Sequence, residues 1–120
     1  MEKVNVAQCF EKFEDLFSPK IVGDLNGQQV MVVRCEGDKV PWHVHENEDE
    51  MFFVVDGILE VYQRDKKVSL QAGEFYIVER GIEHRVIPIG HVKLMLFEPA
   101  GIAHTGKVKS EITKKKFDRL

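Results

Sequence analysis

Short runs of β-forming residues, separated by glycine and polar turns, fill most of the chain and limit the folds open to it. These runs are Gln29 to Cys35, Trp42 to His45, Met51 to Val55, Ile58 to Gln63, Val68 to Leu70, Phe75 to Val78, His84 to Ile89 and Val92 to Glu98. Strands this short and this regularly spaced are typical of an antiparallel sandwich or barrel. The sequence therefore predicts an all-β domain.

The length of 120 residues suits a single domain that buries a core without disulfides or a structural metal. We find no repeat or linker, so we treat residues 1–120 as one domain, with the barrel core at about 20–100. Phe10, Phe13 and Phe17 recur at helical spacing, which predicts an amphipathic helix over residues 6–17 that packs on the barrel and ends at Ser18-Pro19. A charged tail, about 104–120, follows the barrel, and its structure is left open.

The charge and cysteine content narrow the classes of partner. A formal net charge of -3 argues against nucleic acid or an anionic membrane, because both need a concentrated basic surface. Cys9 and Cys35 have neither metal-type nor redox-type spacing. The N-terminus lacks the apolar core of a signal peptide, and no apolar run approaches membrane-spanning length. These features predict a cytoplasmic protein with a small-molecule ligand.

Asp56-Gly57, between two apolar runs, predicts the turn of a β-hairpin, because a type I′ turn needs positive φ at both central residues. The pairs across this hairpin would be Val54 with Leu59, Phe52 with Val61 and Glu50 with Gln63. Met51, Phe53 and Tyr62 then form a second apolar surface on the opposite face. A strand apolar on both faces is buried on both. The N-terminal helix, another sheet or a second subunit must cover that surface, and we expect a homodimer.

Two histidines one residue apart point to a metal site. In an extended strand His43 and His45 face the same way. If the acidic segment after them folds back, Glu50 begins the next strand and joins them, and His84 offers a third imidazole. Three imidazoles and one carboxylate suit one divalent Mn, Fe, Co, Ni, Cu or Zn ion better than Ca or Mg. Four protein ligands leave open positions on an octahedral ion, which is typical of a catalytic metal.

The spacing of these residues resembles the first motif of the cupin superfamily. The match runs through Gly37, His43, His45, Glu50 and Gly57 with intervals of five, one, four and six residues. The second cupin motif is matched in part by Gly73, Gly81 and His84, with Glu79 in place of the usual proline and Pro88 in place of the usual asparagine.

The resemblance implies a small single-domain metal-binding cupin. Such a protein is an antiparallel β-barrel of the double-stranded β-helix or jelly-roll type, often dimeric, with one metal near its mouth. The ligands carried over from the two motifs are His43, His45, Glu50 and His84. The departures at Glu79 and Pro88 fall on turn and support positions rather than on ligands.

Two further side chains are candidates for a catalytic role. If Lys93 faces solvent, alternation sends Glu98 to the interior side of the last strand, where a carboxyl group at the rim of an apolar cavity can act as acid or base. A surface glutamate at the end of that strand is the alternative. Gln63, if the hairpin register holds, is a partner of a metal ligand or touches the substrate. His91 and His104 are interpreted as surface histidines.

Two functions stay open at this point. The first is a metal-dependent enzyme acting on a small polar substrate, by sugar isomerisation or epimerisation or by dioxygenase-type chemistry. The second is a non-catalytic barrel that binds a metal or small ligand, such as a metabolite sensor. Fold alone does not choose between them.

Overall fold

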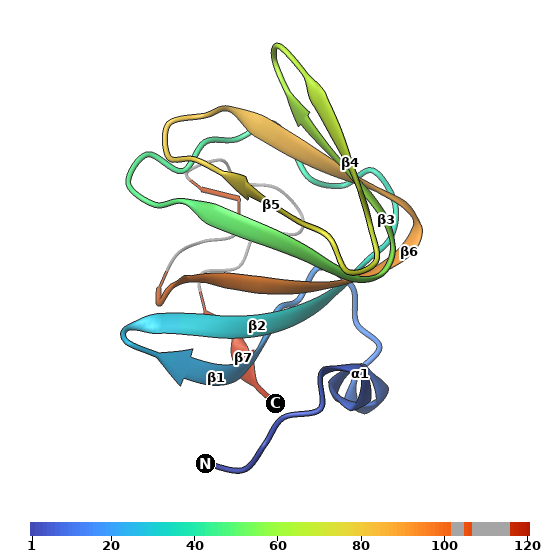
Figure 1. Ribbon diagram of the computed structural model, residues 1–120, viewed down its shortest axis with the longest axis vertical. Helices are drawn as coiled ribbons and strands as arrows, with labels where there is room; N and C mark the ends of the chain where they lie inside the picture. The colour runs from blue at the N-terminus through green and yellow to red at the C-terminus, as the bar shows by residue number, and fades with distance from the viewer. Residues whose placement is uncertain (102–104, 107–115) are drawn as a thin grey trace.

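The computed structural model describes residues 1–101, 105–106 and 116–120. In them a seven-stranded sheet folds over on itself into a barrel (Figure 1). The strands are β1 (Lys20–Leu25), β2 (Gln28–Cys35), β3 (Glu50–Gln63), β4 (Lys67–Gln71), β5 (Phe75–Val78), β6 (His84–Pro99) and β7 (Asp118–Arg119), in the order β4-β3-β6-β2-β1-β7 with β5 on β3. Described neighbours are antiparallel except β1 and β7. The all-β jelly-roll prediction is confirmed.

The two long strands, β3 and β6, bend together and so wrap the sheet around the core. The hairpin predicted at Asp56-Gly57 is wrong, because β3 continues through it and Val54 pairs with Leu94 of β6. Gly57 has a φ of 96°, which permits the bend. A Cβ there would lie 2.7 Å from the His91 carbonyl oxygen, so the two backbones approach closely. The strands expected at 84–89 and 92–98 are likewise one bent strand.

The residues expected on the interior side of β3 do lie there. The cause is a bulge in one continuous strand rather than the predicted hairpin turn. Phe52, Val54, Leu59 and Val61 are all buried in the main core. Register shifts around Asp56 form a bulge, which moves the alternation by one residue and returns the second half of the strand to the same interior.

The N-terminal helix is shorter than predicted. It consists of α1 (Val6–Cys9) and a 3₁₀ turn, Phe10–Lys12, and Phe13 is already extended. Phe10 and Phe13 pack outside the barrel, whereas Phe17 lies in its core, with a φ of 54°. One helix would turn all three rings to one side, so the chain leaves the helix to reach both surfaces. The prediction that the aromatic residues pack on the body holds.

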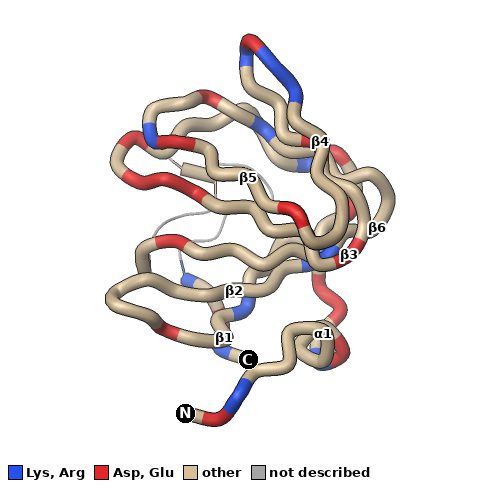
Figure 2. The backbone as a smooth tube through the Cα atoms, viewed as in Figure 1, with Lys and Arg blue, Asp and Glu red and all other residues tan. Residues whose placement is uncertain are grey.

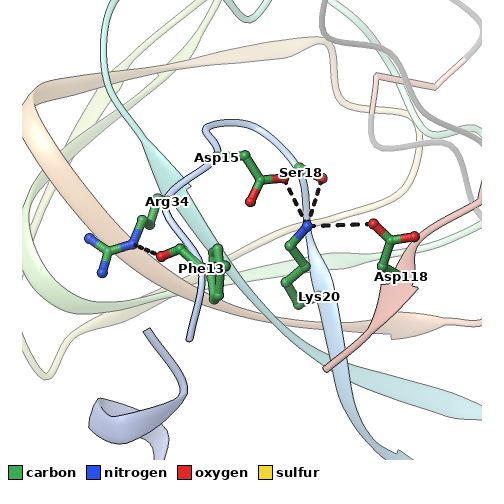
Figure 3. Close-up of polar contacts among 6 residues, drawn as sticks. All are labelled: Phe13, Asp15, Ser18, Lys20, Arg34 and Asp118. Atoms are coloured by element: carbon green, nitrogen blue, oxygen red, sulfur yellow. Dashed lines mark hydrogen bonds and ion pairs between the residues drawn. The ribbon is translucent and has the colours of Figure 1, made fainter. Parts of the chain in front are cut away.

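Polar contacts tie this segment to the sheet (Figure 3). Arg34 Nε on β2 donates to the Phe13 carbonyl at 3.0 Å, and its Nη2 donates to the Phe10 carbonyl. The buried Lys20 ammonium donates to Asp15 at 2.8 Å and lies 3.5 Å from Asp118 of β7. These contacts fasten both ends of the chain to β1 and β2.

The predicted tail falls mostly outside the described residues, as does His104. Its last residues form β7, and Phe117 packs against the main core. Among the described residues, we find no helix with the length and apolarity that crossing a membrane requires.

Candidate metal centre

Three imidazoles and a carboxylate converge inside the barrel. His43 and His45 lie on the extended segment before β3, Glu50 begins β3, and His84 begins β6. All four side chains are buried, with exposed fractions of 1 to 3%. One possible ligand atom from each lies within 4.8 Å of the others. The structure thus brings together the four residues predicted as ligands.

Backbone contacts hold the histidine segment in place. His43 N–H donates to the His84 carbonyl, and His84 N–H donates to the His43 carbonyl, both at 2.9 Å. Gly81 N–H donates to the His45 carbonyl at 2.9 Å. The acidic segment folds back as expected, because the Asp49 carboxylate accepts from the Arg80 backbone N–H at 2.8 Å and pairs with its guanidinium. This turn delivers Glu50 to the interior.

Two of the imidazoles are oriented by carbonyl groups. Nδ1 of His43 lies 2.8 Å from the Pro41 carbonyl oxygen, and Nδ1 of His84 lies 2.9 Å from that of Ile82. A carbonyl accepts only, so Nδ1 holds the proton when each ring is neutral, and Nε2 offers a lone pair. His84 Nε2 and His45 Nε2 lie 3.3 and 3.4 Å from the same Glu50 oxygen.

Several nitrogens at this site lack hydrogen bonds. His43 Nε2 is buried without a hydrogen-bond partner among the described residues, and the two ring nitrogens of His45 lie 3.4 Å from carboxylate oxygens of Glu48 and Glu50 without forming a hydrogen bond. Unsatisfied buried polar atoms are unfavourable and rare. A divalent cation bound by these nitrogens and Glu50 would satisfy them. The donor set therefore fits the metal that the sequence predicts.

The protonation states of His43 and Glu50 suit a metal, whereas that of His45 favours the protonated ring. Burial lowers the pKa of His43 to about 4, so this imidazole is neutral near pH 7. Burial opposes the ionisation of Glu50, but His45 and His84 outweigh it and hold its pKa well below the usual range. Burial also opposes protonation of His45, yet Glu50 and Glu48 together raise its pKa. The site thus combines the Glu50 carboxylate with a neutral His43, and a metal that binds His45 must displace its proton.

Glu98 lies inside, as alternation along β6 predicted, and the surface alternative is wrong. Its side chain is 1% exposed, and neither carboxyl oxygen has a hydrogen-bond partner in the described part of the chain. Burial, together with the nearby Glu50 carboxylate, raises the pKa of Glu98 to about 9. At neutral pH Glu98 is therefore a carboxylic acid, in contrast to Glu50.

Gln63 is not opposite Glu50, because that placement depended on the incorrect hairpin. It pairs with His84 across β3 and β6, and its amide donates to Tyr76 Oη at 3.2 Å.

A cavity of about 40 Å³ adjoins the donors, with His43 and Glu50 in its wall. Most of its other lining residues are apolar, among them Phe17 and Leu94. Cys35 also lines it, and burial raises the pKa of this thiol to about 12. Cys35 was not predicted at this site, although its alternation with Met31 and Val33 indicates an inward position.

Three arginines that could bind an anion are engaged in contacts away from the donors. Arg34 holds the N-terminal segment, Arg80 pairs with Asp49, and Arg85 pairs with Asp38. None of these three arginines lines the cavity.

Known proteins resemble this chain in sequence and structure. The family model described as a cupin domain matches residues 30–99, which include all four donors. A cupin-2 domain containing protein from Shewanella frigidimarina is 35% identical, with a TM-score of 0.77 over 80% of this chain and 93% of that one. A protein from Neisseria meningitidis is 27% identical, with a TM-score of 0.73 over 82% of this chain and 99% of its own.

A third solved structure, KdgF from Halomonas, is 25% identical and has a TM-score of 0.58 over 68% of this chain and 76% of that one. No curated protein matches the chain.

Proposed function

The chain belongs to the cupin superfamily, and from this we propose that it is a metal-dependent enzyme acting on a small polar substrate. His43, His45, Glu50 and His84 would hold one divalent transition metal. The observation that carries the proposal is the convergence of four buried donors, among which His43 Nε2 has no hydrogen-bond partner in the described part of the chain.

The protein's own contribution is orientation and exclusion of water. A bound metal would supply Lewis acidity or, if redox-active, electrons for dioxygen chemistry. The Pro41 and Ile82 carbonyls fix two of the imidazole rings, a constraint typical of metal-binding histidines. The apolar wall of the cavity keeps bulk water from the donors and strengthens the electrostatic interactions there.

The cavity favours a small substrate without a phosphate group. Its volume of about 40 Å³ holds only a few water molecules, and Arg34, Arg80 and Arg85 are engaged in other contacts and do not line it. These features support dioxygenase-type chemistry over isomerisation of a sugar phosphate. In the metal-free protein Glu98 is protonated at neutral pH, and a carboxylic acid beside the donors is a candidate proton donor.

The small cavity also favours one alternative, a non-catalytic barrel in which metal and ligand bind without reaction. The experiment that separates the two strips the protein of metal and reloads it with Fe, Mn, Co, Ni, Cu or Zn in turn. Small diketones, thiols, phenols and sugars are then offered, while oxygen uptake and product formation are followed. We expect turnover that requires metal and is lost in His84→Ala. Ligand binding without turnover for every metal would favour the barrel.

A further inference from the structure

An acidic loop leads into β3 (Figure 2), and one of its carboxylates is turned away from solvent. Glu46 and Asp49 are exposed, and Asp49 pairs with Arg80 at the surface. The side chain of Glu48, in contrast, is only 16% exposed, and its Oε1 lies 3.4 Å from Nδ1 of His45. Glu48 therefore lies against the ring of one of the four donors.

The two ring nitrogens of His45 face different carboxylates. Nε2 lies 3.4 Å from Oε1 of Glu50, the same oxygen that lies 3.3 Å from Nε2 of His84. This nitrogen faces the centre of the donor group, whereas Nδ1 faces Glu48. A metal held by the four donors would therefore bind His45 through Nε2. The single proton of the neutral ring must then lie on Nδ1, where it needs an acceptor.

The other two histidine donors already have such an acceptor. Backbone carbonyl oxygens lie 2.8 Å from Nδ1 of His43 and 2.9 Å from Nδ1 of His84. Nδ1 of His45 has no hydrogen-bond partner among the described residues, and the Glu48 carboxylate is the oxygen placed to take this role. Rotation of a side-chain carboxylate can shorten a contact of 3.4 Å to a normal hydrogen bond.

Charge also suits a carboxylate at this position. A divalent cation bound with Glu50 leaves one positive charge among four buried donors, where that charge is poorly solvated. The Glu48 carboxylate, on the far side of the His45 ring, would neutralise it. A carboxylate that accepts from a ligand imidazole also makes the ring a stronger donor, and losing such a partner lowers metal affinity about 10- to 100-fold.

We propose that Glu48 is a positioning residue of the metal centre, which accepts the Nδ1 proton of His45 and so directs Nε2 of that ring to the metal. The inference rests on the metal site of the proposed function, but it does not rest on turnover. Removing the acceptor should weaken metal binding while the four donors and the fold remain.

Metal affinity is the first test, measured for Zn²⁺ and Co²⁺ by competition with a chelator of known affinity. We expect Glu48→Ala to raise the metal dissociation constant about 10- to 100-fold. Glu48→Gln keeps an oxygen acceptor but loses the charge, so it should raise this constant less. The matched control is Glu46→Ala, which removes an exposed carboxylate from the same loop and should stay within about twofold of the native value. Circular dichroism checks that each variant folds.

The proton on the His45 ring is the second test, because a merely structural role of Glu48 would not move its resonance. Long-range ¹H–¹⁵N NMR of the zinc-loaded protein shows which nitrogen of each ring carries the proton. We expect His45 to carry it on Nδ1 in the native protein. In Glu48→Ala that proton should resonate upfield and exchange faster with water, and Glu48→Gln should restore part of the native signal.

Two kinds of failure can be told apart. Native metal affinity in Glu48→Ala, an equal loss of affinity in Glu46→Ala, or an unchanged His45 proton resonance in Glu48→Ala would overturn the role of Glu48 and leave the metal site intact. A native protein that binds neither Zn²⁺ nor Co²⁺ would overturn this role and the proposed function together.

Discussion

Glu50 and Glu98 are buried carboxyl groups whose surroundings push their pKa values in opposite directions. Imidazoles on both sides keep Glu50 ionised, whereas Glu98 has only burial and a like-charged neighbour and keeps its proton. Because their pKa values differ in this way, Glu50 is suited to bind a metal and Glu98 is suited to donate a proton. This separation is also a source of pH-dependent stability.

In the metal-free protein, Glu98 should make the free energy of unfolding fall as pH rises from about 6.5 to 9. Glu98→Gln should remove this contribution of Glu98 to the pH dependence. The folded state keeps the Glu98 proton up to a pKa of about 9, while the unfolded chain loses it above 4.5. Unfolding therefore releases a proton in this window, at up to about 1.4 kcal/mol per pH unit. His43, whose pKa falls from 6.5 to about 4, has the opposite slope, but only below 6.5.

Urea unfolding of the native protein and Glu98→Gln at several pH values measures this difference. Glu11→Gln, which changes an exposed carboxylate, should keep the native slope. Parallel pH profiles for the native protein and Glu98→Gln would show that the Glu98 proton is not held by the fold.

For single residues, the sequence predicted positions correctly where these follow from spacing along a strand. The intervals between His43, His45 and Glu50 identified the donors, and alternation from Lys93 placed Glu98 inside. Gln63 was misplaced because its position depended on a turn rather than on spacing. The pKa shift of Glu98 could not be given a size, since it depends on burial by residues distant in sequence.

A glycine with positive φ, such as Gly57, can occur either in a hairpin turn or at a bend in a long strand. Asp56-Gly57 reads as a hairpin turn, but the positive φ of Gly57 is used instead to bend one long strand. Local sequence cannot separate these outcomes, because the partner strand β6 decides between them. The helix was overestimated for a similar reason, since tertiary packing draws Phe17 into the barrel.

Gly57→Ala should be far more destabilising than Gly73→Ala. Both glycines have positive φ, 96° and 87°, but only at Gly57 would the new Cβ meet backbone, at 2.7 Å. We expect about 1 kcal/mol for Gly73→Ala from backbone strain and about 3 kcal/mol for Gly57→Ala, where β3 and β6 must also move apart. Equal losses in urea unfolding would show that the bend tolerates a side chain.

Arg34→Lys should loosen the N-terminal segment. Lysine cannot donate to the Phe10 and Phe13 carbonyls in the fork geometry of a guanidinium, and it changes the cation–π contacts with both rings. We expect a loss of about 1 to 2 kcal/mol and faster amide hydrogen exchange over residues 6–13. Arg119→Lys, in an exposed ion pair with Asp24, is the control and should cost about 0.5 kcal/mol or less. Unchanged exchange in Arg34→Lys would assign the attachment to apolar packing alone.

For the whole molecule, the strand spacing predicted an antiparallel sandwich or barrel, and the resemblance to cupins was needed to choose the jelly-roll barrel. Among the described residues, sixteen buried side chains form the apolar core, and none of them is one of the four donors. The barrel should therefore fold without metal, which lets ligand variants be studied as folded proteins. Partner and substrate could not be predicted, since both depend on surfaces that form only when distant strands meet.

Metal content tests the central claim most directly. Inductively coupled plasma mass spectrometry would be applied to the native protein, to His84→Ala and to the control His91→Ala, an exposed histidine outside the donor group. We predict about one equivalent of Mn, Fe, Co, Ni, Cu or Zn in the native protein and in His91→Ala, and a loss in His84→Ala with an unchanged circular dichroism spectrum. No metal in any sample after reloading, or equal metal in all three, would contradict the account.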